Sequence, residues 1–168
     1  MEWPISVICM SKIHASIAKN QLKEILAEGF NGPHGTGYFT SASDDAGLNN
    51  ALKGLNASQA SRKTQPGGSS IASHANHLVF AFEAFIDWIE KKDNKRDWAE
   101  SWSVKDVNEF QWSDLVERLA ACQQKLAEAI DNTDLDDEQS FGGAVAAIVH
   151  MAYHLGAIRQ KLVALHHL

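Results

Sequence analysis

The sequence is poor in cysteine and in clustered basic residues. Its two cysteines, Cys9 and Cys122, stand far apart in 168 residues, so neither a thiolate zinc site nor a disulfide framework is indicated. The net charge of -6 argues against a nucleic-acid surface, because phosphate binding needs clustered lysine and arginine. The one dense basic run, residues 91–96, is interrupted by Asp93 and is predicted to be a solvated loop.

The sequence also lacks the features of a targeting or membrane-spanning segment. No basic stretch precedes an apolar one at the N-terminus, so no signal peptide is expected. No apolar run approaches the roughly 20 residues that cross a bilayer. We therefore expect a cytoplasmic protein without membrane or nucleic-acid partners.

The length and composition fit one globular domain spanning residues 1–168. A chain of this size can bury a continuous core. Hydrophobic residues make up 45% of the sequence and charged residues 21%, values that are typical of a soluble protein. Cys122 falls on a helical apolar stripe and is predicted to be a small core residue.

Helical periodicity begins in the N-terminal part of the chain. The first helix is predicted from about Ser11 to Glu28, with Gly29 as its stop. Its apolar positions are Ile13, Ile17, Leu22, Ile25 and Leu26. A glycine-rich loop follows at residues 31–37. A short helix is expected next, capped by Ser43, with Asp44 and Asp45 in its first turn and with Leu48, Leu52 and Leu55 buried.

Three further long helices are predicted. The second follows Pro66-Gly67-Gly68 and is capped by Ser69 or Ser70, the third is capped by Ser113, and the fourth runs from near Ser140 almost to the C-terminus. Their apolar faces are Ile71, Leu78, Phe82, Phe85 and Ile89; Leu115, Leu119, Cys122, Leu126 and Ala129; and Ile148, Met151, Leu155, Ile158 and Leu162. Residues 91–111 lack periodicity and form a long connection, packed down at Trp98 and Trp102. The chain is therefore predicted to be an all-α four-helix bundle, a fold that builds metal sites from facing helices.

Eight histidines are the unusual feature of the composition. His150 and His154 lie four residues apart on the predicted fourth helix, so their side chains stack about 6 Å apart and can reach one metal ion. Four small residues lie near them, which favours an open volume for a ligand. These are Gly143, Ala146, Ala147 and Ala157. The pair fits equally well as two half-buried histidines that are hydrogen-bonded to their neighbours.

A third histidine would distinguish these alternatives, because three neutral imidazoles plus water form an open site for Zn²⁺ or a similar ion. The second helix offers His74, nearer the centre of its apolar face, and His77, at the edge. Helix geometry alone does not choose between them. The other four histidines are weaker candidates: His14 on the first helix, His34 in the glycine-rich loop, and His166 and His167 at the chain end.

Two segments taken together resemble the DinB-like superfamily, which includes the bacillithiol and mycothiol transferases and the maleylpyruvate isomerase relatives. They are residues 70–78, Ser-Ile-Ala-Ser-His-Ala-Asn-His-Leu, and residues 150–160, His-Met-Ala-Tyr-His-Leu-Gly-Ala-Ile-Arg-Gln. The connection's Asp97-Trp98-Ala-Glu-Ser-Trp102 is similar to the D-W-x-x-S-W of an uncharacterised branch whose fourth helix reads H-x-A-Y-H-L-G-A-I-R-Q. The similarity extends from about Leu48 to Lys161, and the region before Leu48 matches less well.

The resemblance implies a DinB/YfiT-like bundle with a short extra helix and long connections. In that superfamily the metal histidine of the second helix follows the capping serine by seven positions and precedes an aliphatic residue, which fits His77 and not His74. The superfamily's HxxxH pair maps to His150 and His154. The resemblance also implies one divalent transition metal ion, nickel or zinc, and a homodimer.

Three functions fit these residues. The first is a metal-dependent enzyme that activates a thiol or water for transfer or hydrolysis on a small molecule, and the resemblance favours thiol transfer. The second is a non-catalytic metal-containing or stress-related dimeric module that binds a small molecule. The third is a dimeric bundle whose histidine site is vestigial. We expect the enzyme, because three histidines without a fourth matching ligand are typical of a catalytic site.

Overall fold

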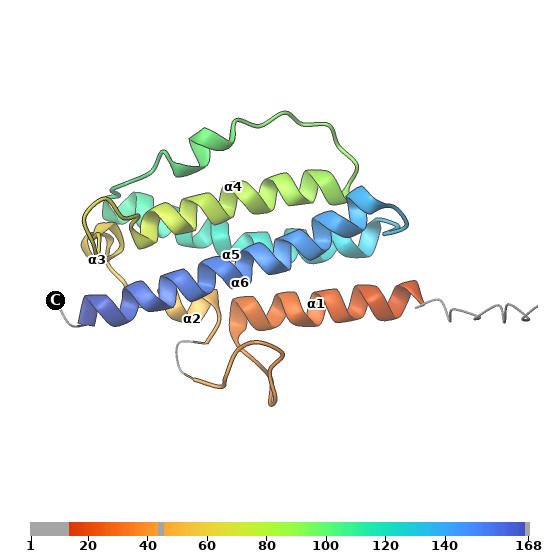
Figure 1. The fold of residues 1–168 in the computed structure, drawn as a ribbon, viewed down its shortest axis with the longest axis horizontal. Helices are drawn as coiled ribbons and strands as arrows, with labels where there is room; N and C mark the ends of the chain where they lie inside the picture. Colours follow the sequence, from red (N-terminus) through yellow and green to blue (C-terminus); the bar gives the residue numbers. More distant parts are fainter. Residues whose placement is uncertain (1–13, 44–45, 167–168) are drawn as a thin grey trace, which may run out of the picture.

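The structure is a computed structural model that describes residues 14–43 and 46–166. Within these ranges every regular element is a helix, which confirms the all-α prediction. The elements are α1 (Ala15–Asn31), α2 (Leu48–Leu52), α3 (Ala57–Ser61), α4 (Ile71–Ile89), the 3-10 helix η1 (Trp98–Trp102), α5 (Glu109–Asn132) and α6 (Glu138–His166) (Figure 1).

Four long helices form the bundle. Helix α4 packs against both α5 and α6, and α1 also packs against both, so α1 and α4 occupy opposite corners. The short helices α2 and α3 lie near the end of the bundle where α6 terminates (Figure 1). The connection between α4 and α5 runs back along α4, and η1 within it contacts that helix.

The apolar faces of the helices meet in one continuous core. Phe30 of α1 and Phe82 of α4 are fully buried, with their ring centroids 5.5 Å apart. Cys122 is 2% exposed, as predicted, and burial raises the pKa of its thiol to about 11. The stripes predicted on α4 and α5 are buried, whereas Ile17, one of the apolar positions of the first helix, is 58% exposed.

Helix α1 ends later than the sequence predicts. Gly29 does not stop it but lies inside the helix, against the side chain of Met151 in α6. The helix continues to Asn31, and the backbone N–H of Gly32 donates to the carbonyl of Glu28 at 2.7 Å. The predicted start, residues 11–13, lies outside the described residues.

The other long helices differ in how well their starts were predicted. Helix α4 begins after Ser70 as predicted, and the Ser70 hydroxyl accepts the backbone N–H of Ser73 at 3.1 Å. The predicted cap Ser113 is wrong for α5, which begins at Glu109. Asn108 caps α5 by accepting from the backbone N–H of Gln111, and the Gln111 side chain accepts the backbone N–H of Asn108 in return. Helix α6 begins at Glu138, two residues before Ser140.

The region between α1 and α4 holds two short helices rather than one. Helix α2 begins after Gly47 and not after the predicted cap Ser43. Asp44 and Asp45, predicted in its first turn, lie outside the described residues. Helix α3 is absent from the prediction, although Asn56 and Gln59 form a capping box at its start.

Helix α6 is long and apolar enough to cross a membrane by length and composition. Between Gln139 and Ile158 it carries no Asp, Glu, Lys or Arg, so it is an exception to the expectation that no such segment exists. The core helix of a soluble protein meets the same criterion, and α6 packs against α1, α2 and α4. Only 39% of the apolar window is buried inside the bundle, so packing accounts for part of its composition, and the cytoplasmic location stays a prediction.

Candidate metal centre

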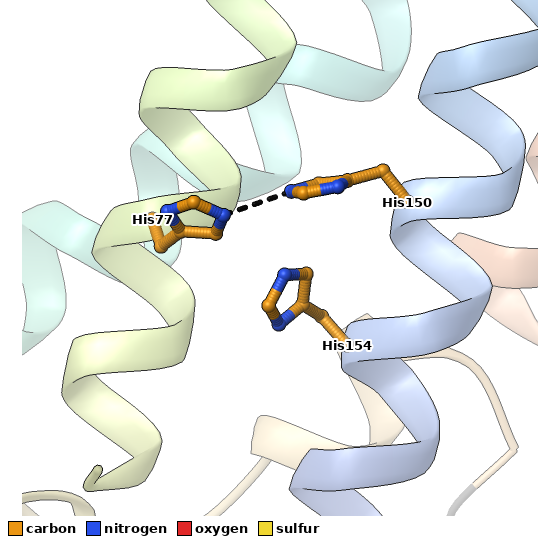
Figure 2. Close-up of side chains that lie close together, drawn as sticks. All are labelled: His77, His150 and His154. Atoms are coloured by element: carbon orange, nitrogen blue, oxygen red, sulfur yellow. Dashed lines mark hydrogen bonds between the residues drawn. The ribbon is translucent and has the colours of Figure 1, made fainter. Parts of the chain in front are cut away.

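Three histidines converge between α4 and α6. His77 comes from α4, His150 and His154 come from successive turns of α6, and the three rings point toward one another (Figure 2). One ligand atom from each ring lies within 4.8 Å of those of the other two. In the described part of the chain, this is the one group of histidine, cysteine or carboxylate side chains placed so that it could hold a metal ion. The structure thus brings together the three residues that the resemblance selects.

The site lies where α4 and α6 approach closely. His77 is 6% exposed and His154 is 2% exposed, while His150 is half-buried. Gly143, two turns before His150, allows the close approach: a Cβ there would lie 3.2 Å from the Cβ of Trp88 and 3.3 Å from the backbone nitrogen of Ile89. The prediction that Gly143 leaves an open volume is therefore wrong, because this glycine serves tight helix packing.

Two groups from the connection hold the His77 ring. The hydroxyl of Ser101 donates to the carbonyl of Trp98 at 2.6 Å, so its single hydrogen is committed there. The Ser101 oxygen therefore accepts from Nδ1 of His77, at 2.8 Å. Trp102 stacks on the same ring, with the centroids 4.2 Å apart and the planes 17° from parallel. These contacts place the proton of His77 on Nδ1 and leave a lone pair on Nε2, which lies 2.9 Å from Nε2 of His150.

Burial keeps these imidazoles neutral near pH 7. Burial and, to a smaller extent, the proximity of His150 lower the pKa of His77 to about 4. Burial also lowers the pKa of His154 to about 3, with contributions from the other histidines. Burial lowers the pKa of His150 as well. Each ring is therefore neutral near pH 7 and carries a lone pair on one of its two nitrogens. Without an ion, Nε2 of His150 donates its N–H to the lone pair of His77.

The donor set fits a divalent transition metal ion. Neutral imidazole suits zinc, copper, iron and nickel. Two imidazole nitrogens on a tetrahedral ion at about 2.1 Å lie about 3.4 Å apart, so His77 and His150 need to separate by about half an ångström. No cysteine or carboxylate within residues 14–43 and 46–166 joins the three histidines. At least one coordination position is thus left for a ligand from outside the described chain.

His74 lies beside this group and makes a different set of contacts. It is 6% exposed; its Nδ1 lies 2.8 Å from Nδ1 of His154, and its Nε2 lies 2.8 Å from the hydroxyl of Ser69. Burial, followed by the positive charge of Lys161, lowers the pKa of His74 to about 4. The two nitrogens of His74 thus face Ser69 and His154, whereas those of His77 face Ser101 and His150.

The remaining candidates do not join the site. His34 is exposed in the glycine-rich loop, and His14 is exposed before α1, where its Nδ1 contacts the Ser16 hydroxyl at 2.7 Å. The side chains of His166 and His167 lie outside the description. Ser101 is the residue whose role the sequence did not indicate, although it stands in the Asp97–Trp102 motif. Its proximity to His77 depends on how the connection folds back along α4.

A helical bundle with three convergent histidines on two facing helices has the architecture of a metal-binding bundle protein. The family model of the DinB superfamily matches residues 45–158, and the chain belongs to this superfamily. The matched segment includes His77, His150 and His154, and it excludes the N-terminal region where the resemblance is weaker. No curated protein and no solved structure matches the sequence.

Proposed function

We propose that the protein is a metal-dependent enzyme in which His77, His150 and His154 hold one divalent transition metal ion, nickel or zinc. The observation that carries this proposal is the convergence of three neutral imidazoles with no fourth ligand among the described residues. Structural zinc sites are normally closed by four protein ligands, whereas catalytic sites keep one position open for water or substrate. The geometry therefore supports catalysis better than a structural ion.

Such an ion lowers the pKa of a bound water or thiol and so supplies a nucleophile at neutral pH. The roles of this chain's residues are to hold the ligand rings, through Ser101 and Trp102 for His77, and to exclude water from the buried side of the site. The reaction is a transfer or a hydrolysis on a small-molecule substrate. Cys122 does not serve as the thiol in such a transfer, because it is buried and burial raises the pKa of its thiol to about 11.

Metal analysis of the purified protein, followed by chelation, tests this proposal. We expect one nickel or zinc ion per chain, loss of transfer or hydrolytic activity in a substrate screen after chelation, and recovery when the metal is added back. Circular dichroism should show that the metal-free protein stays helical, because a core of this size does not need the ion. Activity that survives complete metal removal, or unfolding on chelation, would contradict the proposal. Small-molecule binding without turnover would favour the non-catalytic module.

We also propose that the chain forms a two-fold homodimer through α6. Four exposed apolar side chains recur every four residues on this helix: Phe141, Val145, Val149 and Tyr153. A two-fold axis places the same stripe of two copies face to face, and no charged residue interrupts it. Sedimentation at micromolar concentration should give a dimer mass, and Val149→Lys should give a monomer. A wild-type monomer mass would contradict the proposal.

A further inference from the structure

His74 is a buried histidine whose two ring nitrogens both have partners. One faces the hydroxyl of Ser69 and the other faces Nδ1 of His154, each at 2.8 Å. His154 is itself 2% exposed. Its second nitrogen points toward His77 and His150 (Figure 2). A chain of contacts therefore leads from Ser69 through His74 and His154 to the candidate metal position.

The contact between the two Nδ1 atoms allows two arrangements of protons. A neutral imidazole carries one N–H and one lone pair, so one ring must donate to the other. If His74 donates, the proton of His154 is on Nε2, the nitrogen that faces the other two histidines, and blocks it. If His154 donates, its Nε2 presents a lone pair to the site. His74 then carries its proton on Nε2, where the Ser69 hydroxyl accepts it.

We propose that His74 is a positioning residue that accepts the Nδ1 proton of His154 and thereby holds Nε2 of His154 ready to bind the ion. This inference rests on the metal site proposed above. Metal-ligating histidines commonly donate their other N–H to a neighbouring acceptor, which fixes the tautomer and the ring orientation and makes the ligand more basic. In this chain the acceptor is the lone pair of a second histidine.

A comparison with His77 shows why His154 depends on His74. The Ser101 hydroxyl donates its only hydrogen to the carbonyl of Trp98, so in the His77–Ser101 hydrogen bond His77 must be the donor. The His74–His154 contact has no such built-in direction, because the Ser69 hydroxyl can accept from Nε2 of His74 in one arrangement and donate to it in the other. The proposed arrangement is the one that leaves the lone pair of His154 on Nε2. Within residues 14–43 and 46–166, His74 is the recorded hydrogen-bond partner of His154 Nδ1.

Zinc affinity of the full-length protein, measured by competition with a chromogenic chelator, tests the inference. His74→Leu fills the position with an apolar side chain and removes the hydrogen-bond acceptor. We expect zinc to bind this variant about 10- to 100-fold more weakly than the wild type. His74→Asn restores an acceptor oxygen near the position of Nδ1 and should recover most of the affinity. Ser69→Ala removes only the outer partner and should weaken binding by a smaller factor. His34→Leu, at an exposed histidine, should bind zinc as the wild type does.

A second measurement separates this inference from the proposed function. Nitrogen-15 NMR of the metal-free wild type should show His154 protonated at Nδ1 and His74 at Nε2, and His74→Leu should lose the Nδ1 preference of His154. Equal zinc affinity of wild type and His74→Leu would overturn the role of His74 while leaving the metal site intact. The same holds if His74→Asn binds as weakly as His74→Leu. A wild type that binds no zinc would overturn the proposed function, even with these tautomers present.

Discussion

The interface between α4 and α6 differs in chemistry from that between α1 and α5. The first buries His74, His77 and His154 and brings His150 beside them. The second joins a helix whose buried residues are mainly apolar to one with a regular apolar stripe, and its polar contacts, such as the ion pair of Lys23 with Asp131, lie near the surface. Burying a polar ring costs free energy unless the ring is hydrogen-bonded, so apolar residues stabilise a core more simply than histidines do. Several histidines gathered in one interface therefore indicate a functional site. Ligand binding and stability should therefore respond to separate substitutions.

The strongest test of this separation is His150→Leu. We expect it to abolish stoichiometric metal binding because it removes one of three ligands. The free energy of unfolding of the metal-free protein should change by less than about 2 kcal/mol, because the new side chain packs beside Phe85 but leaves Nε2 of His77 without its partner. Metal analysis and urea unfolding measure the two effects. His77→Ala and His154→Ala should also lose the metal, whereas His74→Ala should retain it with lower affinity. If His150→Leu kept one bound metal ion per chain, His150 would not be a ligand and the proposed separation of metal binding from stability would be wrong.

A substitution in the apolar core should do the opposite. Phe30 is fully buried against Phe82, and Phe30→Ala should lower the free energy of unfolding by about 3–5 kcal/mol through the cavity it leaves. The folded fraction should still bind one metal ion. Urea unfolding and metal titration check both statements, with Ile17→Ala on the exposed face of α1 as the matched control, expected within about 0.5 kcal/mol of the wild type. If folded Phe30→Ala bound less than one metal ion per chain, the apolar core and the histidine site would not be independent.

The start of α5 offers a smaller effect with an internal control. Asn108→Ala removes the side chain that accepts from the backbone N–H of Gln111, and we expect a loss of about 1 kcal/mol. Ser113→Ala should change stability by less than about 0.5 kcal/mol, because Ser113 lies inside the helix. Thermal unfolding of the two variants decides which residue caps the helix. A larger loss for Ser113→Ala would reverse the assignment.

The smallest expected effect concerns the ion pair between α1 and the end of α5. Lys23 lies 2.6 Å from a carboxylate oxygen of Asp131, and both side chains are partly exposed. Lys23→Met should cost less than about 1 kcal/mol, because solvent screens such pairs. The difference from wild type should shrink further in 1 M salt. A large loss of stability that does not change with salt would show that charge is as important to the α1–α5 interface as the histidines are to the α4–α6 interface.

The parts of the fold that follow local rules were predictable from the sequence. The spacing of His150 and His154 placed both on one face of α6, and Ser70 marked the start of α4, because helix periodicity and capping depend on residues a few positions apart. Ser113 and Asn108 are both capping residue types, and the reciprocal partner Gln111 is the local signal that favours Asn108. Gly29 lies inside α1, where its lack of a side chain leaves room for Met151, and the helix ends instead before Gly32, which has a positive φ.

The contacts that complete the site depend on tertiary structure and could not be predicted from local spacing. Ser101 is 24 residues from His77 in the sequence, and His74 is 80 residues from His154. Ser101 meets His77 because the connection folds back along α4, and His74 meets His154 because α4 and α6 pack side by side. The choice of His77 came from the resemblance, and helix geometry left His74 equally open. The structure separates them by what their nitrogens contact.

The convergence of α4 and α6 has one more consequence, for the way the chain unfolds. His77 and His150 are 73 residues apart in the sequence, so an ion bound to both closes a long loop. By the chain-entropy relation used for disulfides, closing such a loop costs the unfolded chain about 4 kcal/mol of conformational freedom. A loaded site would therefore behave as a reversible cross-link. Full unfolding would have to wait for the ion to leave, so the metal would lengthen the lifetime of the native state even though the bundle folds without it.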